Sequence, residues 1–144
     1  MFFASDNAGP VYPQIMERIT AANSDYAMPY GHDPIMEDVR KSIRALFEAP
    51  QAEVYLVATG TAANALALAC YCQPWQTIFC SKTSHIQEDE CNAPEFYTGA
   101  AKLTTIETTD RMTPAALQAE IAARVLGNVH SAQPGPVSIT QVTE

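Results

Sequence analysis

The stretch that most constrains the fold is 53–72, which has the sequence EVYLVATGTAANALALACYC. Its first half contains a short apolar run, 54–57, of the kind that forms a β-strand. Its second half, 62–72, is rich in Ala and Leu and contains no Gly or Pro, which predicts a helix. Because neither half has a polar face, we expect both to lie in the interior of a layered α/β domain.

The turn between the predicted strand and helix places Gly60 and Thr61 at a helix N-terminus. Backbone N–H groups without partners and the positive end of the helix dipole meet there, which favours an anion. Gly60 allows a phosphate to approach the backbone, and the Thr61 hydroxyl adds a donor. The turn has neither of the glycine-rich nucleotide signatures, GxGxxG or GxxxxGK[ST]. Taken alone, it is equally well explained as an ordinary connection with Thr59 or Thr61 as the N-cap.

The composition predicts one soluble domain. The 144 residues are 47% hydrophobic, and their net charge of −8 argues against nucleic acid or an anionic membrane as a partner. No apolar run reaches the length of a membrane span, and the start of the chain lacks the basic segment of a signal peptide, so we expect a cytoplasmic location. The four cysteines show no zinc spacing, so no metal site is expected and buried reduced thiols are the simplest interpretation.

Strands and helices alternate along most of the chain. Helices are predicted over 13–23, 34–49, 62–72 and 115–124, and strands over 54–57, 77–80, 102–106 and 137–140. This order predicts an α/β fold with a mostly parallel sheet and helices on both faces. We also expect an apolar stripe of the first helix, Ile15, Met16 and Ile19, to be buried.

Several polar residues follow predicted strands. Ligands bind such sheets at the carboxyl ends of the strands. Gly60, Thr61, His85 and the stretch around Gln141 all follow strands, so we expect them to converge on one crevice. His130 precedes a strand, and its position is harder to predict.

Six stretches spread along the whole chain carry a resemblance to a known family: FASDNAG, MPYGHD, VATGTAANALAL, SHIQEDECNAPEFYTGAAKL, RMTPAAL and VSITQVTE. Together they resemble the low-specificity L-threonine aldolases, within the fold type I (aspartate-aminotransferase-like) pyridoxal-phosphate enzymes. The resemblance implies that 1–50 form an N-terminal arm with two helices. It implies that 51–144 form the first part of the cofactor-binding large domain. Full-length members are much longer, so we expect this chain to correspond to their N-terminal part.

The resemblance implies cofactor-binding roles for three residues. Those matching Gly60 and Thr61 bind the phosphate of pyridoxal 5′-phosphate, in agreement with the helix N-terminus described above. The residue matching His85 stacks on the pyridine ring and directs its nitrogens toward the substrate. The alternative for His85 is a side chain that caps a helix.

Three further residues are implied to face the substrate. The residue matching Ser5 lies near the substrate carboxylate, and the one matching Tyr30 reaches the active site across a subunit boundary. The residue matching His130 is tied to the substrate hydroxyl in some members, so the resemblance implies that either His85 or His130 is the catalytic residue that removes the hydroxyl proton. Packing within a loop is an equally good interpretation of Tyr30, as is an ordinary loop histidine for His130.

The implied reaction of the full-length protein is the cleavage of L-threonine or L-allo-threonine to glycine and acetaldehyde, in a homodimer or homotetramer with shared active sites. The lysine that binds the cofactor covalently, the aspartate at the pyridine nitrogen and the arginine at the substrate carboxylate have no counterpart in the chain. The lysines present, Lys41, Lys82 and Lys102, do not match that position. The alternatives are another fold type I lyase or aminotransferase, or a chain that binds a phosphate or cofactor without catalysis.

Overall fold

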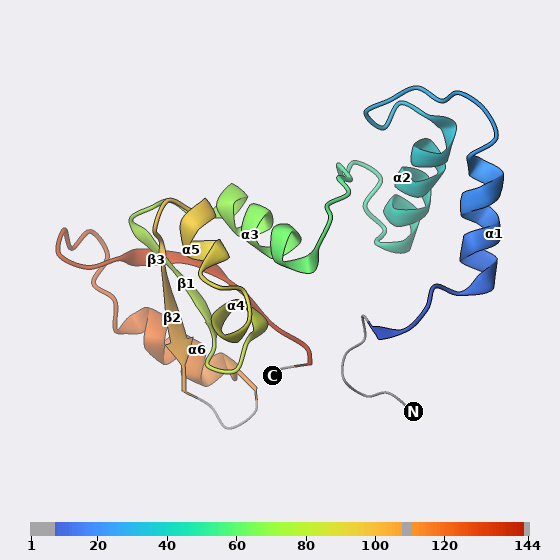
Figure 1. Ribbon diagram of the computed structural model, residues 1–144. Coiled ribbons are helices and arrows are strands. Elements are labelled where there is room, and N and C mark those ends of the chain that lie inside the picture. Colours follow the sequence, from blue (N-terminus) through green and yellow to red (C-terminus); the bar gives the residue numbers. More distant parts are fainter. Residues whose placement is uncertain (1–7, 108–110, 143–144) are drawn as a thin grey trace. The chain divides into compact units, whose positions relative to one another are not determined.

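The computed structural model describes residues 8–107 and 111–142, and the chain divides into two compact units between Tyr55 and Leu56 (Figure 1). Unit 1 contains the helices α1 (Pro13–Ala22) and α2 (Pro34–Leu46), and unit 2 contains every strand. The boundary expected from the sequence, after residue 50, lies a few residues earlier than this division.

The α2 helix of unit 1 begins where the sequence predicts. Asp33 is its N-cap, since the carboxylate accepts a hydrogen bond from the backbone N–H of Met36 at 2.9 Å. Proline follows at the first helical position, where it costs no hydrogen bond. Arg40 then donates to the carbonyl oxygen of Gly31 at 2.9 Å, which ties the preceding loop to the helix.

No described residue of unit 1 is buried. Ile15, Met16 and Ile19 of α1 remain about half exposed, so the prediction of a buried stripe is wrong for this structure. The reason is that α1 makes few contacts with the other described helices and strands. An apolar stripe of this kind is typical of a surface that packs against another element.

The sheet of unit 2 has three strands: β1 (Gln76–Ser81), β2 (Lys102–Ile106) and β3 (Gln133–Val137). Their order is β2-β1-β3, and both pairings are parallel (Figure 1). β1 lies in the centre, and five of its six residues are buried, as expected for an inner strand of a parallel sheet.

Helices cover both faces of this sheet. Ile78 and Cys80 of β1 belong to the core cluster on one face, together with residues of α3 (Gly60–Tyr71) and α4 (His85–Glu88). Successive strand residues point to opposite faces, so Thr77 faces the other side. There its hydroxyl bonds that of Thr104, which accepts from Arg124 directly beyond α6 (Pro114–Ala122). The predicted parallel α/β fold is therefore confirmed.

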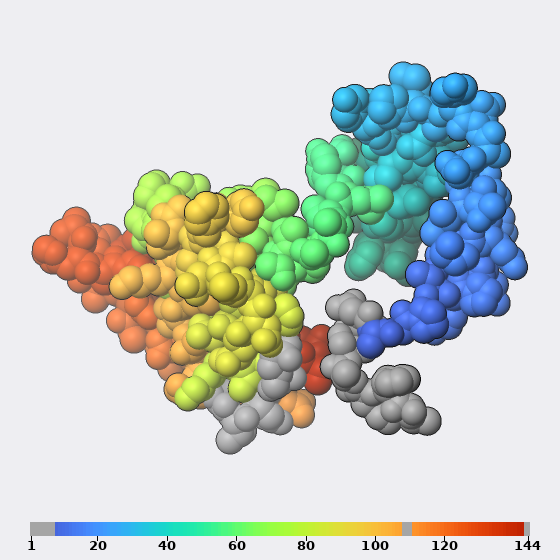
Figure 2. All heavy atoms as spheres, viewed as in Figure 1, coloured from blue at the N-terminus to red at the C-terminus, as the bar shows by residue number. Residues whose placement is uncertain are grey.

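The segment after β1 folds back over the first of these faces. It contains α4 and α5 (Ala93–Tyr97); α4 packs on β1 and α5 packs on α3. Figure 2 shows the atoms of this segment, in yellow, gathered on one face of unit 2. The core below it consists of Leu68, Cys72, Ile78, Cys80, Ile86 and Ala101.

β3 begins earlier than predicted and includes two prolines. Pro134 and Pro136 are tolerated because β3 is an edge strand of the described sheet, where a missing N–H breaks no ladder. Gly135 is required between them: a Cβ atom there would lie 2.7 Å from the carbonyl oxygen of Thr77. The prediction of a strand over 137–140 was wrong because the pairing of β3 with β1 cannot be recognised from the local sequence.

The prediction of a strand over 54–57 was also wrong. Tyr55 and Leu56 are 82% and 68% exposed, and no strand is present there. A β-strand needs a neighbour for its hydrogen bonds, and the described residues supply none. For the same reason α3 is less buried than expected: Ala65 and Leu68 are inside, but Leu66 and Tyr71 are exposed.

All four cysteines are free thiols. Cys72 and Cys80 are buried as predicted, whereas Cys70 and Cys91 are exposed. Cys70 lies on the uncovered side of α3, which explains why the prediction of burial failed there. Within the described ranges, no helix has both the length and the apolar character needed to cross a membrane.

Candidate functional site

The N-terminus of α3 is open. Thr59 is its N-cap, since the hydroxyl accepts from the backbone N–H of Ala62 at 3.1 Å. Gly60 and Thr61 follow as the first helical residues, whose N–H groups have no partner within the helix. A Cβ atom on Gly60 would meet nothing within 4 Å, so the space before these amides is clear. The cap and the proposed anion site therefore coexist.

A buried carboxylate lies at the centre of the best-defined polar cluster in unit 2. Oε1 of Glu90 lies 2.8 Å from Nδ1 of His85, and the same oxygen accepts from Nδ2 of Asn64 at 2.7 Å. The Glu90 side chain is fully buried, while that of His85 is 42% exposed. The histidine therefore presents part of its ring to the surface and is held from behind by a carboxylate.

The fold explains how these three residues meet. His85 opens α4 shortly after β1 ends at Ser81, and Asn64 lies about one turn beyond Gly60 on α3. Glu90 lies in the turn between α4 and α5. The chain reverses there through two residues with positive φ, Cys91 (50°) and Asn92 (61°). Glu90 thus links the first half of α3 to the segment that carries His85.

The second carboxylate oxygen of Glu90, Oε2, is buried without a hydrogen-bond partner among the described residues. Burying an acceptor in this way is costly, and such groups concentrate at functional sites. Both described contacts of the Glu90 carboxylate, with His85 and Asn64, are therefore made through a single oxygen, Oε1.

A cavity of about 100 Å³ lies where β1 and β3 end. It is lined by Ser81, Arg111, Met112, Ile139, Thr140 and Gln141. The expected stretch around Gln141 thus lies at the same sheet edge as the end of β1, the edge at which parallel sheets bind ligands.

His130 lies elsewhere. Its side chain is exposed, and its backbone N–H donates to the Asn128 side chain at 2.9 Å. Because Gln133 pairs with Gln76, the first residue of β1, His130 lies beyond the amino edge of the sheet. His85 follows the carboxyl edge. The two histidines are therefore separated by the length of a strand, which rises about 3.3 Å per residue. The described chain does not bring the two histidines together.

The remaining predicted site residues lie outside unit 2 or outside the described residues. Tyr30 is in unit 1 with a side chain that is 94% exposed and a φ of 60°. Ser5 lies outside the described residues.

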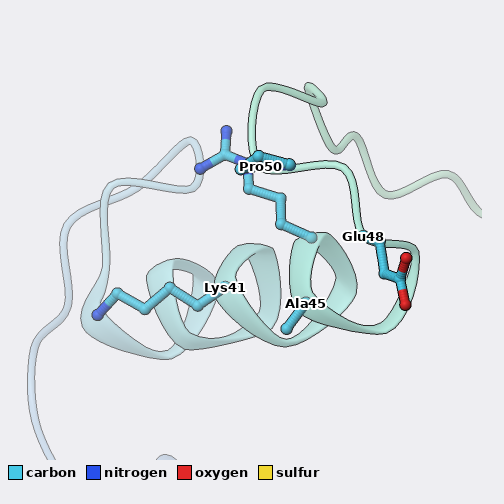
Figure 3. Close-up of a pocket in the computed structure, with 5 residues that line it drawn as sticks. Lys41, Ala45, Glu48 and Pro50 are labelled. Carbon is cyan, nitrogen blue, oxygen red and sulfur yellow. The ribbon is translucent and has the colours of Figure 1, made fainter.

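Two of the three lysines form ion pairs on the surface. Lys82 pairs with Glu107 at 3.5 Å and Lys41 pairs with Asp38 at 3.4 Å. Lys41 also borders an open groove along α2, which is lined by Lys41, Arg44, Ala45, Glu48 and Pro50. Figure 3 shows the side chains of Lys41 and Glu48 at opposite ends of this groove, so no polar cluster converges there.

Sequence reasoning missed Glu90 and Asn64. The available signal was weak: Asn64 is the one amide in an otherwise largely apolar helix, and Glu90 follows His85 by five residues. Their contact joins positions 26 residues apart, which no local pattern reveals.

Fold and site define a parallel α/β protein in which an open helix N-terminus is linked through a buried carboxylate to a surface histidine. The chain belongs to the beta-eliminating lyase family, whose model matches residues 3–144.

Two relatives are low specificity L-threonine aldolases, from Pseudomonas aeruginosa (strain PAO1) and Pseudomonas sp. (strain NCIMB 10558). Each is 38% identical over 143 residues, which are 99% of this chain and 40% of the relative. The chain thus spans about two fifths of the length of these curated relatives. The predicted family resemblance is confirmed.

A solved structure of the threonine aldolase from Leishmania major has the same fold. It superposes with a TM-score of 0.86 at 24% identity, over 95% of this chain and 39% of that chain. This likeness supports the predicted fold type I architecture.

Proposed function

We propose that the whole protein containing this chain cleaves L-threonine and L-allo-threonine to glycine and acetaldehyde with pyridoxal 5′-phosphate. The observation that carries the proposal is the link from the α3 N-terminus to His85 through Asn64 and Glu90. The similarity to two L-threonine aldolases over 99% of the chain supports it.

The residues present fit this cofactor. The open N-terminus at Gly60 and Thr61 suits the negatively charged phosphate, because the amides and the helix dipole both favour an anion. The partly exposed imidazole of His85 offers a face for an aromatic ring. Once bound, pyridoxal phosphate supplies the electron sink for the pair of electrons left when Cα–Cβ breaks.

The chain's own residues supply orientation and proton transfer. Gly60 and Thr61 fix the phosphate, which sets the position of the bound molecule relative to His85. His85 would accept the proton of the substrate β-hydroxyl as a general base. We assign this step to His85 rather than His130 because His130 lies at the other edge of the sheet. Ser5 at the substrate carboxylate and Tyr30 at the active site remain proposals.

None of the three lysines is assigned the covalent role. Lys82 is nearest in sequence to His85, but its side chain is 61% exposed and pairs with Glu107. We therefore expect borohydride to fix no cofactor onto the 144-residue chain, which by itself is a binding module. Stoichiometric labelling of Lys82 would overturn this assignment.

The direct test is glycine release by the full-length protein with added pyridoxal phosphate. We expect glycine from both L-threonine and L-allo-threonine, in keeping with the similarity of the chain to low specificity L-threonine aldolases. Absence of glycine from both diastereomers would contradict the proposal.

A second candidate is a β-eliminating lyase, which the description of the matching family favours. Such an enzyme forms ammonia and a keto acid from a substrate with a β-leaving group. The products that the same preparation forms from L-serine separate the two candidates, because only the β-eliminating lyase forms ammonia and a keto acid. Amino transfer to an added keto acid would instead indicate an aminotransferase.

We also propose a homodimer or homotetramer with shared active sites, located in the cytoplasm. The exposed Tyr30 and the half-exposed stripe of α1 support assembly. Four unpaired thiols support a reducing compartment. Light scattering of the full-length protein measures the assembly, and a monomer would contradict it.

A further inference from the structure

We propose that Glu90 is a positioning residue that holds the proton of neutral His85 on Nδ1, so that Nε2 is the nitrogen that accepts a proton. The tautomer is inferred from the described contacts alone. Only the identity of the proton donor, the substrate hydroxyl, rests on the proposed function.

A neutral imidazole donates from one nitrogen and accepts at the other, and the partner of one nitrogen decides the role of both. An ionised carboxylate has no proton to donate. With Oε1 of Glu90 2.8 Å from Nδ1 of His85, Nδ1 must be the donor and Nε2 the acceptor.

Glu90 is fixed in place. Its side chain is fully buried, and Asn64 of α3 donates to the same oxygen that contacts His85. The two positive-φ residues that follow, Cys91 and Asn92, set the direction of the backbone. A charge held this way acts on His85 constantly and more strongly than it would in water.

His85 is not the capping residue of α4. Ser84 is the N-cap residue of α4, and His85 is the first helical position. The Nδ1 atom of His85 lies 2.8 Å from Oε1 of Glu90. The carboxylate contact therefore sets the orientation of the ring.

Asn64 extends this arrangement to the anion site. It lies about one turn beyond Gly60 and bonds the same Glu90 oxygen as His85. A ligand that orders the first turn of α3 is thereby connected to the ring of His85 through two hydrogen bonds. The binding site and the histidine form one unit.

The experiment is nitrogen-15 NMR of the full chain carrying ring-labelled histidine, without cofactor or substrate. The chain has only three histidines, and His85→Asn identifies the His85 signals by their loss. At about pH 9 ordinary histidines are neutral, so the shifts report which nitrogen carries the proton. We expect Nδ1–H for His85. A signal for Nε2–H in the unmodified chain would overturn the proposal without any variant of Glu90.

Replacing Glu90 tests whether its carboxylate determines the tautomer of His85. In Glu90→Leu the acceptor is gone, and we expect the ratio of Nδ1–H to Nε2–H to fall by about tenfold or more, as charge-assisted hydrogen bonds warrant. Glu88→Gln changes an exposed carboxylate on α4, the helix that carries His85, and should leave the ratio unchanged. His32 and His130 serve as internal references in every sample. A folded Glu90→Leu protein with an unchanged ratio would contradict the proposal.

The readout is independent of catalysis. If the full-length protein releases no glycine while His85 is Nδ1–H, the proposed function fails and this inference stands. If glycine is released while His85 is Nε2–H, the inference fails and the function stands.

Discussion

The side chain of Asn64 donates to Glu90 at 2.7 Å across 26 residues of sequence, and it ties the start of α3 to the turn that positions His85. Asn64 is exposed by residue, but its contact is with a fully buried carboxylate. The bond therefore matters to stability as well as to the site.

Replacing Asn64 by Ala should lower the free energy of unfolding by about 1–3 kcal/mol, because a buried charged acceptor loses a donor. Urea unfolding measures the change. Gln87→Ala, at an exposed position of α4, is the control and should stay within about 0.5 kcal/mol of the unmodified chain. Equal losses in the two variants would show that Asn64 does not stabilise Glu90.

Gly135→Ala should destabilise the sheet. The added Cβ would lie 2.7 Å from the Thr77 carbonyl oxygen and 3.1 Å from Cβ of Gln76, so β3 must move away from β1. We expect a loss of about 1–3 kcal/mol, the usual range for overpacking. Thermal unfolding checks this, and an unchanged midpoint would contradict the close approach of the two strands.

Gly60→Ala should weaken cofactor binding without lowering the stability of the fold. Nothing lies within 4 Å of the added Cβ, so the unfolding midpoint should not fall. Affinity for pyridoxal phosphate in the full-length protein should weaken, by about tenfold, if a phosphate approaches this backbone closely. Fluorescence titration of the cofactor gives the affinity, and an unchanged value would place the phosphate elsewhere.

Stability should decline at alkaline pH through Cys80. Burial raises the pKa of this thiol, and the charge of Glu95 acts in the same direction. As pH rises above about 8.5, the unfolded chain loses the thiol proton while the folded chain keeps it. The unfolded state then binds fewer protons, so the free energy of unfolding falls with pH. The stabilising contribution is complete below the unfolded pKa and is lost as pH passes the folded one.

The slope from one thiol is at most about 1.4 kcal/mol per pH unit. Urea unfolding between about pH 8 and 10 should show a shallower decline for Cys80→Ala than for the unmodified chain. Cys70→Ala, at an exposed thiol, is the matched control and should keep the original slope. The cavity left by Cys80→Ala lowers stability at every pH, so the slope decides the outcome. Identical slopes in all three proteins would contradict the assignment.

Local signals made much of the fold predictable. Asp33-Pro34 and Thr113-Pro114 marked the starts of α2 and α6, since a capping side chain followed by proline leaves few alternatives. The apolar β-branched run before Cys80 marked β1. The N-terminus of α3 was predicted from a related signal, because Gly60 and Thr61 follow a cap residue and precede an Ala-rich segment.

Long-range contacts account for what the sequence did not reveal. The apolar run at 54–57 has the composition of a strand, but strand formation depends on a neighbour that the described residues do not provide. β3 contains two prolines and is a strand only because it pairs at an edge. The contacts of Glu90 join separate parts of the chain and follow no periodic sequence pattern. The sequence therefore predicted His85 as a site residue but did not predict that Glu90 and Asn64 hold it.

We have proposed that His85, held by Glu90, is the proton acceptor of an L-threonine aldolase. The rate of glycine release by the full-length protein and by its His85→Asn and His130→Asn variants tests this assignment. We predict that the first variant loses about a hundredfold or more in kcat, as removal of a general base requires, and that the second changes little. Equal losses, or a greater loss in His130→Asn, would contradict the account.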